Sequence, residues 1–194
     1  MGRSPRADFR AYAHRGGALE ATENSLAAFR QAAALGFTYL ETDVRPTRDG
    51  VAVLHHDADL TRTTDGSGKV RDHTWQQLRS VRLADGSAPL RLEELLEDLP
   101  DAHVNVDVKE EGSVVALAEA VRRSNAASRV TVTSFSARRL SRARHLMPPG
   151  TESSAHPREV QTQRAIPPPR PHPPLTPVHD PERAQGGTRV EPRI

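Results

Sequence analysis

Short, strand-like apolar runs alternate along the chain with segments whose apolar residues recur at helical spacing, and this alternation restricts the possible folds more than any other feature. The four leucines between residues 92 and 99, for example, follow the i, i+3, i+4, i+7 pattern of a helix that buries one side. Strands are expected at residues 9–13, 37–44, 103–109 and 129–135, and helices at residues 26–33, 92–99, 114–121 and 140–147. Regular alternation of strand and helix predicts an α/β fold, with a parallel sheet and helices outside it.

The connections between these elements are of several kinds. Residues 47–50 form a predicted turn, because Asp49-Gly50 accommodates positive φ, and residues 51–54 return as a short strand. Residues 58–88 are polar and rich in turn-forming residues, so we interpret them as a small insertion outside the core. A further short strand is suggested near residues 151–155.

Both ends of the chain lack these patterns. Residues 1–8 are expected to be disordered, and 12 of the 16 prolines lie from Pro148 onward. Residues 161–194 are rich in proline and arginine and bury too little apolar surface to offset their chain entropy, so a disordered tail is expected after a partial barrel at residues 9–160. We hypothesise that the sequence after about Val160 is an out-of-frame or otherwise aberrant translation, which would fail if the other frames of the DNA encode no strand–helix pattern there.

Composition excludes several classes of function. Cysteine is absent, which removes disulfides, thiolate metal sites and a cysteine nucleophile. Aromatic residues make up only 4% of the chain, and the basic residues are spread along it, so no nucleic-acid partner is expected. No run approaches the roughly 20 apolar residues of a membrane span. The first ten residues have no apolar signal-peptide region, and a soluble cytoplasmic protein is expected.

Acidic side chains lie near the ends of two predicted strands. Glu41 and Asp43 are two residues apart and therefore share a face, as do Asn105, Asp107 and Lys109. The carboxyl ends of the strands in a parallel α/β barrel meet at one mouth, where active sites are found. Three carboxylates gathered there would repel one another unless a divalent cation neutralised them, and oxygen ligands favour Mg²⁺ or Ca²⁺. The alternative is that these carboxylates are solvated or paired with the many arginines.

Two histidines are candidates for proton transfer, because imidazole titrates near neutral pH. His14 and His56 both follow strand-like runs, and one on each side of a phosphorus atom could deprotonate a nucleophile and protonate a leaving alkoxide. Arg15 and Lys109 are suited to hold phosphate oxygens, Arg15 through its planar fork and Lys109 as a point charge. Strand alternation allows only one of His55 and His56 to face the mouth. The other histidines are interpreted as surface or satisfied core residues: His73, His103, His145, His156, His172 and His179.

Together these motifs resemble the glycerophosphodiester phosphodiesterase family, over residues 9 to about 160. The family pattern is a strand ending in His-Arg-Gly, a Pro-Glu-Asn-Thr helix start, a Glu-x-Asp-Val strand, a Thr-x-Asp-Gly turn, a Val-x-x-His-Asp return and an Asn-x-Glu-x-Lys strand. In this chain the corresponding segments are residues 14–16, 22–25, 41–44, 47–50, 53–57 and 105–109, and Ser134-Phe135 is similar to the family's Ser-Phe. Six linked motifs in the same order make the resemblance specific.

The resemblance implies a (β/α)8 barrel with a small insertion after the second strand. It further implies one divalent cation held by Glu41, Asp43 and Asp107, with His14 and His56 as the acid/base pair. The expected reaction is hydrolysis of a glycerophosphodiester to glycerol 3-phosphate and an alcohol. The metal would act as a Lewis acid on a phosphoryl oxygen.

The chain also departs from the family pattern. Thr22 and Ser25 replace Pro and Thr, and Asp107 replaces the usual Glu, which shortens that ligand by one methylene. Strands are legible for only part of an eight-stranded barrel, so the fold class is an incomplete TIM barrel. Two alternatives to the active enzyme therefore stay open. One is a catalytically inactive fragment that acts as a binding or assembly-dependent module, and the other is a related phosphodiesterase acting on another lipid headgroup.

Overall fold

A computed structural model describes residues 10–17 and 21–154. Its parallel strands follow the order β1 (Tyr12–His14), β2 (Tyr39–Pro46), β4 (His103–Val108), β5 (Val130–Thr133) and β6 (Glu152–Ser153). A short antiparallel strand, β3 (Ala52–Leu54), pairs with the end of β2. These five parallel strands are part of a TIM barrel, which has eight when complete. The expected incomplete barrel is confirmed.

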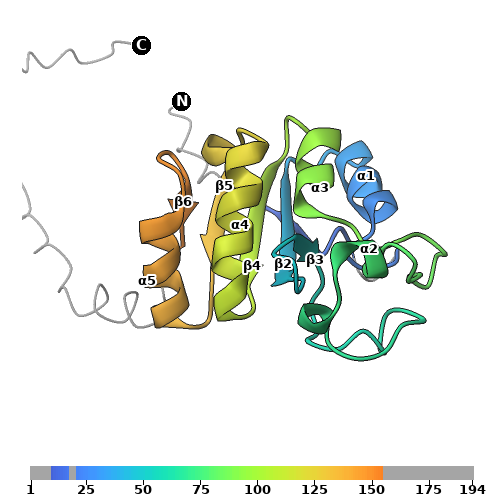
Figure 1. Ribbon diagram of the computed structural model, residues 1–194. Helices are drawn as coiled ribbons and strands as arrows, with labels where there is room; N and C mark the ends of the chain where they lie inside the picture. The colour runs from blue at the N-terminus through green and yellow to red at the C-terminus, as the bar shows by residue number, and fades with distance from the viewer. Residues whose placement is uncertain (1–9, 18–20, 155–194) are drawn as a thin grey trace, which may run out of the picture.

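Among the residues that the structure describes, four helices of at least seven residues follow strands of this sheet and lie along one side of it (Figure 1). They are α1 (Leu26–Ala34), α3 (Leu92–Asp98), α4 (Glu111–Arg123) and α5 (Ala137–Leu146). Ser25 begins α1, because its hydroxyl accepts a hydrogen bond of 3.2 Å from the Ala28 N–H. Gly36, with φ of +91°, lies just after the end of α1. Within the described residues, no helix is long and apolar enough to cross a membrane.

The sheet has one apolar face, and the helices cover it. Every second residue of β4 and β5 is a buried valine on this face: Val104, Val106, Val108, Val130 and Val132. They pack against buried side chains of the helices, including Phe29, Leu95, Leu117 and Leu140. This contiguous cluster contains most of the buried apolar side chains of the described residues, so the helix-facing side of the sheet is the core.

The alternate residues form a second, polar face arranged in layers. Strand register places Tyr12, Tyr39 and His103 side by side at the amino ends of their strands. The rings of Tyr12 and Tyr39 are tilted by 57° with their centroids 5.4 Å apart, and those of Tyr39 and His103 stack with their centroids 5.1 Å apart. The three rings form one aromatic layer. The next layer contains His14, Glu41, Asn105 and Thr131, and the layer nearest the carboxyl ends contains Asp43, Asp107 and Thr133. The parallel register thus brings the sequence-predicted carboxylates together.

The predicted insertion has more structure than its polar composition indicated. Between β3 and α3 the chain forms a 3-10 turn, η1 (Val70–Asp72), and a short helix, α2 (Trp75–Leu78), which begins with a capping box between Thr74 and Gln77. A small apolar cluster supports this excursion; its buried members are Val53, Leu60, Val70 and Leu78. Single apolar residues spread through a polar segment have no periodicity, which explains why the sequence did not reveal the cluster.

The remaining expectations concern the bounds of the helices and strands and the two ends of the chain. The four predicted strands and four predicted helices are present, with bounds shifted by a few residues, and the suggested strand near residues 151–155 is β6. A second 3-10 turn, η2 (Ala127–Arg129), leads into β5. The expected disorder of residues 1–8 and of the tail at residues 161–194 lies outside the described residues.

Candidate active site

A cavity of about 530 Å³ lies on the polar face of the sheet, at the carboxyl ends of the parallel strands. Its lining includes all seven side chains that the sequence analysis assigned to a site: His14, Arg15, Glu41, Asp43, His56, Asp107 and Lys109. The other lining residues are Asn105, Thr133, Ser134, Phe135 and Ser154. Residues that are up to 140 positions apart in the chain, from His14 to Ser154, therefore surround one space.

The turn after β1 sets the position of His14 and Arg15. Arg15 and Gly16 both have positive φ, +51° and +79°, and the N–H of Gly17 donates a 2.9 Å hydrogen bond to the His14 carbonyl. A Cβ at Gly16 would lie 3.0 Å from both the Ala28 Cβ and the Phe29 nitrogen. Glycine is required because this turn is pressed directly against the first turn of α1.

Glu41 lies between the two residues of this turn. Its Oε2 accepts a 3.2 Å hydrogen bond from the Arg15 N–H and lies 3.7 Å from the His14 Nε2. Burial and the nearby charge of Asp43 raise the pKa of Glu41 to about 7, although the Arg15 N–H and Lys109 oppose the shift. This carboxylate therefore needs a further positive charge to be fully ionised at neutral pH.

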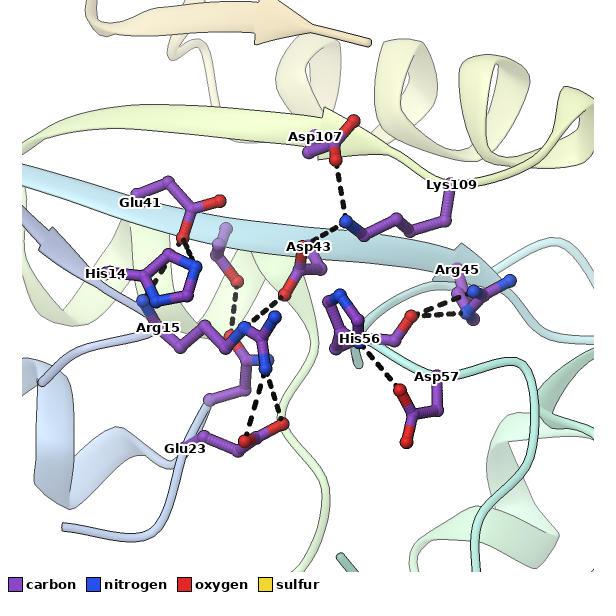
Figure 2. A network of polar contacts seen from close by, with 12 residues as sticks. His14, Arg15, Glu23, Glu41, Asp43, Arg45, His56, Asp57, Asp107 and Lys109 are labelled. Atoms are coloured by element: carbon purple, nitrogen blue, oxygen red, sulfur yellow. Dashed lines mark hydrogen bonds and ion pairs between the residues drawn. The ribbon is translucent and has the colours of Figure 1, made fainter. Parts of the chain in front are cut away.

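Lys109 reaches between the carboxylates of β2 and β4, as Figure 2 shows. Its Nζ lies 2.8 Å from Asp43 Oδ1 and 2.6 Å from Asp107 Oδ2. Burial disfavours the ammonium charge, but these two carboxylates outweigh that effect and raise the pKa of Lys109. Asp43 also pairs with Arg15, whose Nε is 3.1 Å from Oδ2; this contact is an ion pair without hydrogen-bond geometry. The two predicted phosphate-binding cations thus pair with two of the three predicted metal ligands, Asp43 and Asp107.

Several oxygens of the cavity have unused capacity to accept a hydrogen bond or a cation. Within the described residues, the buried atoms Asp107 Oδ1 and Asn105 Oδ1 have no hydrogen-bond partner. No group of three His, Asp or Glu residues in the same part of the chain is arranged to hold a metal ion. The donor set still suits a hard cation, because it consists of carboxylate and amide oxygens. The Lys109 ammonium lies between two of these carboxylates, Asp43 and Asp107, and its contacts with them would have to break before a cation could bind both.

His56 is held at both its ring and its backbone. Its Nδ1 lies 2.6 Å from Asp57 Oδ1, and its carbonyl accepts hydrogen bonds of 3.0 and 2.8 Å from the Arg45 guanidinium (Figure 2). The neighbouring His55 is buried and its Nε2 lies 3.1 Å from the Asp59 carbonyl. The expectation that only one of the two histidines faces the cavity is confirmed.

The sequence analysis missed part of the surroundings of the cavity. Both carboxylate oxygens of Glu23 lie 3.3 Å from an Arg15 terminal nitrogen, so Glu23 fixes that guanidinium from the side opposite Asp43. Glu23 stands in the Thr22–Ser25 segment, which was interpreted only as a helix start. Of the histidines assigned to other positions, His103 stacks on Tyr39, whereas His73 and His145 bond to backbone carbonyls near them in sequence. His156, His172 and His179 lie outside the described residues.

Comparison with known proteins identifies the family. Residues 14–167 match the family model described as "Glycerophosphoryl diester phosphodiesterase family". The chain belongs to this family. Among curated relatives of the family, the probable glycerophosphodiester phosphodiesterase 2 of Mycobacterium tuberculosis is 44% identical over 146 residues, which are 75% of this chain and 55% of that protein. The chain therefore spans little more than half the length of that relative.

Solved structures of the glycerophosphoryl diester phosphodiesterase family share the fold. The glycerophosphoryl diester phosphodiesterase domain of an uncharacterized Mycobacterium tuberculosis protein matches with a TM-score of 0.71 and 28% identity, over 79% of this chain and 61% of that one. An Oleispira antarctica phosphodiesterase, in complex with the product sn-glycerol-3-phosphate, matches with a TM-score of 0.66 and 27% identity, over 71% of this chain and 62% of that one.

Proposed function

We propose that the cavity hydrolyses glycerophosphodiesters to glycerol 3-phosphate and an alcohol, with a divalent cation and a pair of histidines. The observation that carries the proposal is the gathering of two imidazoles, three carboxylates and two basic side chains around one cavity at the carboxyl ends of parallel strands. A phosphodiester needs these three kinds of group: cationic groups for its negative oxygens, a base for the nucleophile and an acid for the leaving alkoxide.

The substrate class is supported by family membership and by charge. The name of the matching family refers to glycerophosphoryl diesters, and one of the similar structures contains sn-glycerol-3-phosphate. Arg15 and Lys109 provide the positive charge for the phosphate group. Each is at present paired with carboxylates, so part of its charge becomes available to an anion only when another cation takes over those carboxylates.

Glu41, Asp43 and Asp107 would hold the cation, Mg²⁺ or Ca²⁺. When bound, such an ion supplies Lewis-acid polarisation of a phosphoryl oxygen. The raised pKa of Glu41 supports this assignment, because burial and the nearby charge of Asp43 leave this carboxylate with too little positive compensation. When the cation and the phosphodiester bind, Lys109 exchanges its contacts with Asp43 and Asp107 for a contact with a phosphate oxygen.

His14 and His56 act as the proton carriers in this proposal. The free hydroxyl of the glycerol attacks phosphorus, gives its proton to one imidazole and forms a cyclic phosphate, while the bond to the alcohol breaks and the other imidazole protonates the alkoxide. Water then opens the cyclic phosphate to glycerol 3-phosphate with the proton transfers reversed. The Asp57 carboxylate at Nδ1 of His56 leaves Nε2 as the nitrogen that exchanges the proton.

The test is turnover of the purified full chain on glycerophosphocholine and glycerophosphoethanolamine, with Mg²⁺, with Ca²⁺ and with a chelator. Cation-dependent release of glycerol 3-phosphate that disappears in His14→Ala and His56→Ala supports the proposal. Absence of turnover from a folded chain, for every substrate and cation, overturns it and favours the inactive fragment. Release of phosphate-containing products only from other lipid headgroups favours the related phosphodiesterase.

A further inference from the structure

Arg62 belongs to the excursion between β3 and α3, yet its guanidinium contacts two carboxylates beside the active-site cavity. Its Nε donates a hydrogen bond to Asp57 Oδ2. Its terminal nitrogens donate to the two oxygens of Glu23 at 2.7 and 3.1 Å, in a bidentate pair. One planar side chain from the excursion therefore joins the segment after β3 to the segment before α1.

Each of these carboxylates also holds a residue of the cavity. Asp57 contacts His56 Nδ1 at 2.6 Å, and Glu23 contacts an Arg15 terminal nitrogen at 3.3 Å with both oxygens. Figure 2 shows these two contacts on opposite sides of Asp43. The five side chains form a continuous line of hydrogen bonds and ion pairs, His56–Asp57–Arg62–Glu23–Arg15.

Arg62 is the partner that the two carboxylates of this line share. The hydrogen bond from Arg62 is the largest influence on both carboxylates, and it lowers the pKa of Glu23 and of Asp57. Both are therefore ionised at neutral pH and can accept from two donors at once. Arg62 itself is about half exposed, with 48% of its side-chain surface accessible, so its effect on overall stability is small.

We propose that Arg62 is a positioning residue of the site: by holding Asp57 and Glu23 together, it keeps His56 in one tautomer and orientation and keeps Arg15 beside Asp43. The inference rests on the proposed function for its catalytic consequence, but its structural content is independent of turnover. The excursion thus contributes to the geometry of the site through Arg62, although no atom of Arg62 lines the cavity.

The competing explanation is an ordinary surface ion pair, and the chain contains a matched example. Arg30 of α1 donates two hydrogen bonds to the two oxygens of Asp98 of α3, and 60% of its side chain is exposed. Neither residue lines the active-site cavity. Arg30→Met therefore removes a bidentate arginine–carboxylate pair of the same chemistry without the connection to His56 and Arg15.

The experiment compares wild type, Arg62→Met, Arg62→Lys and Arg30→Met by two measurements. The first is ¹⁵N NMR of histidine-labelled protein at fixed pH, with the His56 signals assigned by their loss in His56→Gln. The second is steady-state release of glycerol 3-phosphate from glycerophosphocholine. For Arg62→Met we expect mixed His56 tautomers and a kcat lower by about 10- to 100-fold, with a smaller rise in KM. Arg62→Lys recovers part of kcat, and Arg30→Met matches wild type in both.

Each outcome decides the inference. A single, unchanged His56 tautomer together with kcat within twofold of wild type in folded Arg62→Met overturns it, and so does an equal effect of Arg30→Met. If Arg62→Met does not fold, the same two measurements on Arg62→Lys decide. If wild type has no turnover, the proposed function fails, and the tautomer comparison alone then decides whether Arg62 positions His56.

Discussion

The two faces of the sheet are built in opposite ways from the same strands. On the helix side, alternate residues of β4 are Val104, Val106 and Val108, fully packed and without polar atoms in their side chains. On the cavity side, the residues between and next to them are Asn105, Asp107 and Lys109, which are partly or fully buried. The Oδ1 atoms of Asn105 and Asp107 have no hydrogen-bond partner. The comparison teaches that one face supplies the stability that allows the other to hold crowded charges.

The largest expected effect is a loss of turnover on substitution of the two histidines that line the cavity. His14→Ala or His56→Ala should lower kcat by about 10²- to 10⁴-fold, because each removes a proposed proton carrier, while the thermal melt stays near that of wild type. His103→Ala is the matched control, since His103 lies on the same face but in the aromatic layer at the amino ends. Release of glycerol 3-phosphate is the measurement. Equal losses in all three variants would remove the distinction between the two ends of this face.

The helix face should respond in stability rather than in activity per folded molecule. Leu117→Ala deletes a fully buried side chain of α4 and should lower the free energy of unfolding by about 2–5 kcal/mol. Val115→Ala, on the same helix but 46% exposed, should change it by less than about 0.5 kcal/mol. Urea unfolding followed by circular dichroism measures both. Similar values for the two variants would mean that α4 does not pack as described.

The ionisation of Glu41 should make the stability of the protein depend on pH. Its folded-state pKa of about 7 lies above that of an unfolded glutamate, so its contribution to stability is fully present below about pH 4.5 and is lost as pH rises through 7. In metal-free protein at pH 8, Glu41→Gln should therefore be more stable than wild type, by about 1–3 kcal/mol. Below pH 4.5 that advantage should vanish.

The same pair of proteins tests the proposed cation. Mg²⁺ or Ca²⁺ should raise the melting temperature of wild type at pH 8 and have less effect at pH 5, where the cation must displace a proton from Glu41. Glu41→Gln should show a weaker shift at both values of pH. A cation-induced shift that is equal in the two proteins would exclude Glu41 as a ligand.

The smallest effect should come from the ion pair between two helices. Arg30→Met should lower the free energy of unfolding by no more than about 1 kcal/mol, because the pair with Asp98 is exposed to solvent. Arg15→Met removes an arginine of the cavity and should instead raise KM for the substrate severalfold. Urea unfolding and steady-state kinetics on the two variants test this. A rise in KM for Arg30→Met would contradict the separation of the faces.

The helix face could be predicted almost fully from the sequence, because its residues recur with the period of a strand or a helix. The cavity face was predicted as a set of residues but not as a set of contacts. Lys109 was assigned to phosphate, yet it lies between Asp43 and Asp107, since a parallel register brings together side chains more than 60 residues apart. No local pattern encodes that register.

The ion pairs of Arg62 show a second limit of sequence analysis. Its partner Glu23 is 39 residues away, and the excursion that brings them together depends on a small apolar cluster without periodicity. The adjacent Asp57 was visible in the His56-Asp57 motif, but its contact with the imidazole depends on side-chain orientation. Long-range electrostatic contacts of this kind result from the fold, and no motif in the sequence indicates them.

Gly16 limits how this site can be mutated or grafted onto another protein. It carries no reactive group, yet any side chain there must push the His14–Arg15 turn away from the start of α1. In a library of random variants, residue 16 should thus score like a chemically essential position, and only a comparison of soluble yield with turnover would distinguish the two causes. A graft of this turn onto another scaffold needs the first turn of its supporting helix to be transferred with it.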